Sequence, residues 1–108
     1  MEGSYVVKPE NKRILLTGEE AVAVLKEINL ILISLHKMGS YYADKDEVEY
    51  GAETTRFIDE RNVTQRLAYV RRVLSEKFDS GLGEDDMDDL EREMENIEYW
   101  SPRPQADG

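Results

Sequence analysis

The sequence predicts a mainly α-helical fold: a three-helix bundle-like domain with a short N-terminal β-hairpin. Residues 17–38 carry apolar side chains at helical spacing, and two later stretches repeat apolar residues at intervals of three and four. Only the first sixteen residues contain short runs typical of strands. A chain of 108 residues fits one domain, which we place at 1–100 with a frayed tail at 101–108.

A β-hairpin is predicted for residues 4–16. Residues 5–7 and 13–16 form two short runs of aromatic, β-branched and aliphatic side chains, and Pro9 suits the second position of a type I turn between them. Because a two-stranded hairpin is marginal by itself, we expect it to pack on the first helix. The alternative is an irregular arm.

The first helix is predicted for residues 17–38, where Thr17 and Glu20 have the spacing of a capping box. Its expected buried stripe consists of seven apolar residues at helical spacing: Ala21, Val24, Leu25, Ile28, Ile31, Leu32 and Leu35. The opposite side of the helix carries Leu30 and Ile33. A helix that is apolar on two sides is normally covered on both, so we expect either the hairpin or a second copy of the chain to bury these two residues.

Residues 40–53 are predicted to form an acidic loop that is longer than most helix connections. Tyr41, Tyr42 and Tyr50 alternate there with carboxylates. A calcium-binding loop is excluded, because no register combines oxygen ligands at the required positions with glycine at the sixth. The tyrosines either pack on the core or form a contact loop for a partner, since tyrosine is common at protein interfaces.

A second helix is predicted for residues 55–78 and a third for residues 84–99. The expected buried stripe of the second helix is Phe57, Val63, Leu67, Val70, Leu74 and Phe78. The apolar seam of the third is Met87, Leu90, Met94 and Ile97, and we expect Trp100 to pack back on the bundle. The acidic side chains around that seam are the main candidates for partner binding: Asp85, Asp86, Asp88, Asp89, Glu91, Glu93 and Glu95.

The net charge of -10 is unevenly distributed along the chain. Residues 44–53 carry -4, residues 54–78 carry +3, and residues 79–100 carry -9. An acidic chain repels the phosphates of nucleic acids, so we expect no nucleic-acid binding. We also expect no membrane span, because charged residues interrupt the apolar run of the first helix.

Signals of catalysis are weak. The chain has no cysteine, which removes disulfides, thiolate metal sites and thiol nucleophiles, and its one histidine, His36, is interpreted as structural. Asp85 and Asp89 could together bind magnesium, but any helix this acidic offers such pairs by chance. We therefore predict no enzyme and no cofactor. No signal peptide is visible before residue 17, so we expect a cytoplasmic protein.

These features predict a non-catalytic acidic protein-interaction module. In its most concrete form it is an inhibitor or immunity-type protein that covers a basic surface of a protein partner. Two alternatives remain open. One is a dimeric structural or regulatory subunit whose homodimer contact contains Leu30 and Ile33. The other is a carboxylate metal-dependent enzyme.

Overall fold

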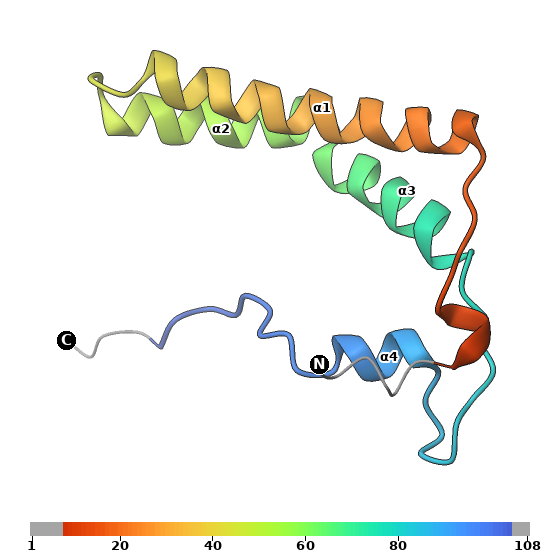
Figure 1. The fold of residues 1–108 in the computed structure, drawn as a ribbon. Coiled ribbons are helices and arrows are strands. Elements are labelled where there is room, and N and C mark those ends of the chain that lie inside the picture. The colour runs from red at the N-terminus through yellow and green to blue at the C-terminus, as the bar shows by residue number, and fades with distance from the viewer. Residues whose placement is uncertain (1–7, 105–108) are drawn as a thin grey trace. The chain divides into compact units, whose positions relative to one another are not determined.

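The computed structural model describes residues 8–104, and it confirms the mainly α-helical class (Figure 1). The chain forms two compact units. The helical unit comprises residues 13–78 and contains α1 (Gly18–Tyr41), α2 (Glu47–Glu60) and α3 (Val63–Ser75). The terminal unit joins residues 8–12 to residues 79–104, with a 3-10 helix, η2 (Pro9–Asn11), and α4 (Asp89–Met94).

Helix α1 begins where the sequence predicts, because its capping box is formed. The Glu20 amide donates to Thr17 Oγ1 at 3.0 Å, and the Thr17 amide donates to Glu20 Oε1 at 3.0 Å. These bonds satisfy amides that lack partners within the first helical turn. The helix then runs through Gly39 to Tyr41, three residues beyond its predicted end.

The predicted loop over residues 40–53 and the predicted single helix over 55–78 are both wrong. Helix α2 already starts at Glu47, where the Asp46 carboxylate accepts a bond from the Val48 amide at 2.9 Å. It ends at Glu60, because Asn62 adopts a left-handed conformation with φ of 52°. Asparagine tolerates that conformation better than most residues, so the chain turns there and restarts as α3.

The core of the helical unit lies between α1 and α3. Val24 packs with Val70 and Val73, and four partly buried residues surround them: Leu16, Ile28, Tyr69 and Leu74. Two ion pairs reinforce this contact. Arg66 Nη1 of α3 lies 2.7 Å from Glu27 Oε1 of α1, and Lys77, two residues beyond the end of α3, pairs with Glu20. Because the residue later in the chain pairs with the earlier residue of α1, α3 runs antiparallel to α1.

The predicted buried stripes are only half correct. In α1, Val24 and Ile31 are buried, but Leu25 and Leu32 are 53% and 61% exposed and Leu35 is also exposed. The reason is that α2 and α3 both pack on one side of α1, so a helix with apolar residues all round keeps one side bare. In α3, Leu67 is exposed, and the sequence pattern missed Val73, which is buried.

No β-hairpin forms within residues 8–104, which contain no strand. Residues 9–11 form η2 instead, with the Asn11 amide donating to the Lys8 carbonyl at 2.8 Å. Proline favours the first turn of a helix. The Asn11 side chain bonds to residues of the C-terminal segment, so this turn is stabilised by distant partners rather than by a neighbouring strand. The predicted first strand, at residues 5–7, lies outside the described residues.

The predicted third helix is much shorter than expected, since α4 covers only Asp89–Met94. Asp86 has a left-handed φ of 63°, which prevents a helix from starting at residue 84. An Asp88–Glu91 capping box then starts α4. Glu95 follows α4, and its carboxylate would be repelled by the negative end of the helix dipole. Trp100 belongs to the terminal unit and is 83% exposed. Its expected packing on the helical bundle stays a prediction.

Within residues 8–104, no helix is long and apolar enough to cross a membrane. Residues 101–104 are exposed and irregular, and the rest of the predicted frayed tail lies outside the described residues.

Candidate functional site

The fold brings together the three tyrosines nominated from the sequence. Tyr41 ends α1, Tyr42 follows it, and Tyr50 lies one turn into α2, so the turn between the helices places them side by side. The Tyr41 and Tyr42 rings meet edge to face with centroids 4.8 Å apart, and Tyr42 and Tyr50 lie 5.9 Å apart. Tyr41 and Tyr50 remain exposed while Tyr42 is partly buried. We call these residues the tyrosine cluster.

Lys45, which the sequence pattern did not single out, belongs to this cluster. Its ammonium lies 4.3 Å from the centroid of the Tyr41 ring and donates to the Tyr41 carbonyl at 2.9 Å. The spacing of four residues between Tyr41 and Lys45 was the available signal, because such residues are neighbours on a helical turn. The lysine therefore contacts both the ring and the backbone of Tyr41.

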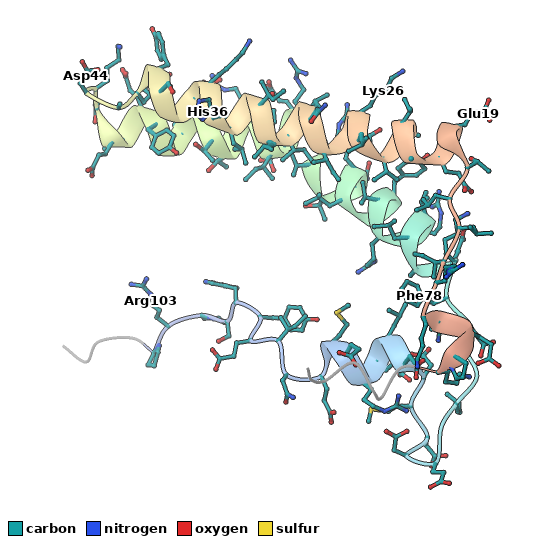
Figure 2. The ribbon with its side chains drawn as sticks, in the orientation of Figure 1. Glu19, Lys26, His36, Asp44, Phe78 and Arg103 are labelled. Atoms are coloured by element: carbon teal, nitrogen blue, oxygen red, sulfur yellow. The ribbon has the colours of Figure 1, made fainter. Side chains whose placement is uncertain are left out.

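Carboxylates surround the tyrosine cluster. Residues 44–53 carry five of them, and Figure 2 labels Asp44 at the turn. Burial of the Tyr42 hydroxyl raises its pKa, and the nearby Glu53 and Glu49 carboxylates raise it further. The hydroxyl therefore stays protonated to a higher pH than that of an ordinary tyrosine, and it can donate a hydrogen bond. Apolar rings, a hydroxyl donor and negative charge thus lie within one short stretch of surface.

The terminal unit contains a second polar arrangement, centred on Asp89, which is only 3% exposed. Its carboxylate accepts from the Lys8 amide at 2.7 Å, from Asn11 Nδ2 at 2.8 Å and from Arg92 Nη1 at 2.8 Å. These hydrogen bonds, led by that of Asn11, lower the pKa of Asp89. We call Lys8, Asn11, Asp79, Asp89 and Arg92 the Asp89 network.

Asn11 and Lys8 also bind the start of the C-terminal segment. The Asp79 amide donates to Asn11 Oδ1 at 2.7 Å, and Asn11 Nδ2 donates to the Asp79 carbonyl at 3.2 Å. The Lys8 ammonium contacts the Asp79 carboxylate at 2.5 Å, which lowers the pKa of Asp79 and raises that of Lys8. Asn11 is buried, and no local signal in the sequence pointed to it, because its partners lie 68 and 78 positions away.

Arg92 binds two of the nominated acids. Its guanidinium contacts Asp85 through Nε at 2.7 Å and Nη2 at 2.8 Å, and Asp89 through Nη1 at 2.8 Å. The hydrogen bonds from Arg92 hold the pKa of Asp85 well below its usual range. A magnesium ion at this pair would have to displace the guanidinium from both carboxylates.

The nominated acidic residues therefore differ in their surroundings. Asp85 and Asp89 bind Arg92, whereas Asp88 and Glu91 form the capping box of α4 through bonds of 2.8 Å and 3.0 Å. Within residues 8–104, the other three nominated acids make no recorded ion pair or side-chain hydrogen bond: Asp86, Glu93 and Glu95.

Among the described residues, no group of three or more histidine, cysteine, aspartate or glutamate side chains is arranged to hold a metal ion. His36, labelled in Figure 2, is exposed on α1. Comparisons with protein-family models, with curated proteins and with solved structures find no match to this chain.

Proposed function

We propose that this chain is a non-catalytic acidic protein-interaction module that binds a basic protein partner, in the manner of an inhibitor or immunity-type protein. The observation that carries the proposal is the tyrosine cluster with its surrounding carboxylates at the turn between α1 and α2.

Tyrosine suits this role because it offers a large rigid contact area at a low cost in conformational entropy. Tyr41 is held by Lys45 and by the edge of Tyr42, so its ring is ordered before a partner arrives. Preorganised anchors lose less entropy on binding. The cluster would supply the apolar centre of the contact.

The carboxylates would orient the basic partner and speed its association. Residues 44–53 have a net charge of -4, and an acidic patch attracts a basic surface from a distance. Association with such a partner should therefore slow steeply with salt while dissociation changes less. The alternative contact is the acidic surface of the terminal unit, where Asp86, Glu93 and Glu95 make no ion pair or side-chain hydrogen bond within residues 8–104.

The test is affinity capture from the native cell with matched variants. Tyr41→Ala with Tyr50→Ala removes the exposed rings without touching the core, and Glu47→Gln with Glu49→Gln removes two charges on α2. Wild type should recover a basic protein at low salt. Each double variant should bind the purified partner roughly ten times more weakly, since aromatic anchors and charged contacts commonly cost that much or more.

The control is Glu93→Gln with Glu95→Gln, which makes the same charge change in the terminal unit. If wild type and both cluster variants recover the same proteins in the same amounts, the tyrosine cluster is not a binding surface. If only the control variant loses the partner, the acidic terminal unit binds it instead.

A further inference from the structure

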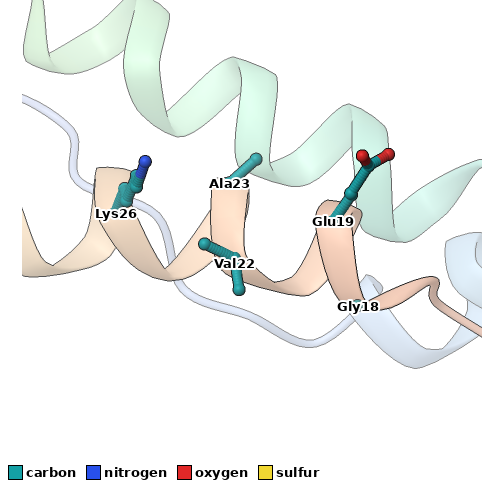
Figure 3. A pocket seen from close by; sticks show the side chains of 5 residues that line it. All are labelled: Gly18, Glu19, Val22, Ala23 and Lys26. Atoms are coloured by element: carbon teal, nitrogen blue, oxygen red, sulfur yellow. The ribbon is translucent and has the colours of Figure 1, made fainter.

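The side of α1 that faces away from α3 carries exposed apolar residues (Figure 2). Two shallow hollows follow one another along this side, and Figure 3 shows the first, formed by α1 alone. Figure 2 places Glu19 and Lys26 on the side of α1 away from α3. The second hollow includes Leu30 and Ile33. No hairpin forms over them within residues 8–104, and Ile33 is 48% exposed.

The lining residues of each hollow have the spacing of a helix-packing hole. The first contains Glu19, Val22, Ala23 and Lys26, which occupy positions i, i+3, i+4 and i+7. The second contains Lys26, Asn29, Leu30 and Ile33 at the same spacing. Four residues in this arrangement receive one side chain from a facing helix in knobs-into-holes packing.

We infer that two copies of the chain pair through α1 in antiparallel orientation, with Ile33 of each copy seated in the first hollow of the other. This inference is independent of the proposed function, because the surface lies on α1 and not at the tyrosine cluster. An interface of this kind is isologous, so each contact occurs twice.

A single register of the two α1 helices pairs the exposed apolar residues of one copy with those of the other. If Ile33 enters the hollow around Val22 and Ala23, each residue of one copy faces a particular residue of the other copy. The two residue numbers of such a facing pair add up to about 56. At ~100° per residue, Leu25 and Leu32 lie on one flank of the line from Val22 to Ile33. In an antiparallel pair each flank meets the same flank of the partner, so Leu25 faces Leu32 of the second copy.

The opposite flank gives charge complementarity in this same register. Glu19 and Lys37 both lie on this flank, and their numbers add up to the required value. Glu19 of each copy therefore faces Lys37 of the other, and both side chains are exposed in the single chain. Lys26 lies near the twofold axis, where its aliphatic stem can pack while its ammonium reaches water.

The small core of the helical unit also favours a second copy as the occupant. Its buried apolar residues are all β-branched and of moderate size: Val24, Ile31, Val63, Val70 and Val73. The leucine side chains of Leu25 and Leu32 in α1 stay outside this core. A pair would cover eight aliphatic side chains, contributed by Val22, Leu25, Leu32 and Ile33 of each copy.

The test is a charge-reversal cycle read by sedimentation equilibrium between about 1 and 100 μM. Glu19→Lys and Lys37→Glu should each weaken the dimer roughly tenfold, because two attractive contacts become repulsive. The double variant should restore the wild-type dissociation constant. Glu93→Lys makes the same charge change as Glu19→Lys but in the terminal unit, so it controls for the changed net charge of that variant and should not weaken the dimer.

Engineered cysteines test the orientation, since the natural chain has none. Asn29→Cys places its thiol near the twofold axis and should form a disulfide-linked dimer under mild oxidation. Glu19→Cys should not, because the two copies of residue 19 would be ~27 Å apart along the axis at ~1.5 Å per residue. Ile33→Asp should give a monomer with an unchanged circular dichroism spectrum, because this residue lies outside the core.

Three results would overturn the inference. The first is a wild-type chain that stays monomeric at 100 μM, and the second is a double charge reversal as weak as either single variant. The third is linkage through Glu19→Cys as fast as through Asn29→Cys, which would indicate a parallel pair.

Discussion

Replacing Asn11 with alanine should open the terminal unit locally while the helical unit stays folded. Asn11 is buried, and its carboxamide makes three hydrogen bonds, to the Asp89 carboxylate and to the amide and carbonyl of Asp79. Leaving buried polar groups unpaired costs about 1 to 3 kcal/mol. Because Asp79 is itself exposed, water can replace part of the loss, and we expect about 1 to 2 kcal/mol.

Asn11→Asp is the sharper variant, because it keeps the shape of the side chain. It replaces the Nδ2 donor with an oxygen, which then faces the Asp89 carboxylate at the 2.8 Å where a hydrogen bond stood. Two carboxylates this close repel each other. At neutral pH aspartate should therefore destabilise the terminal unit more than alanine, and the difference should shrink as acid protonates the pair.

The measurement is amide hydrogen exchange by NMR, which reports the free energy of local opening. The amides of Lys8 and Asp79 should lose protection in both variants, whereas amides in the middle of α1 should not change. Glu10→Ala, an exposed neighbour in η2, is the control. Unchanged protection at Asp79 in Asn11→Ala, or an aspartate variant as stable as wild type, would refute the role of this side chain.

Three further predictions follow from the same contacts. The pKa values of Asp79 and Asp89 are lowered in the folded chain. Their stabilising effect is therefore complete above the ordinary aspartate pKa and is lost as the pH falls through the lowered values. Protection of the Lys8 amide should hold at pH 5 and fall on further acidification. Asn62→Val should cost about 1 to 2 kcal/mol in urea unfolding because of its left-handed backbone, while Asn62→Gly should not, and equal losses would contradict this. Ile28→Ala should lower the free energy of unfolding by about 2 kcal/mol, which is at the low end for such truncations because Ile28 is only partly buried. A loss below about 1 kcal/mol would mean that α1 does not form the centre of the core.

Local signals predicted the helical class and the start of α1. The Thr17–Glu20 spacing gave the helix start because both partners lie within one turn. The three tyrosines were nominated from composition alone, and their contacts follow from a short turn between adjacent helices.

Two helix boundaries were missed although local residues set them. Asn62 and Asp86 both adopt left-handed conformations, which end one predicted helix and delay another. The residue types permit this conformation but do not require it, since both also occur inside helices.

The sequence by itself determined which segments can be helical, where α1 is capped and how the charge is distributed along the chain. Only the tertiary structure decided that Lys8 and Asn11 bind the C-terminal segment and that Leu25 and Leu32 stay on the surface. The physical reason is separation along the chain. Capping and periodicity act within one or two turns, whereas Asn11 and Asp89 meet across 78 positions, and a helix that is apolar all round does not specify which side its neighbours will cover.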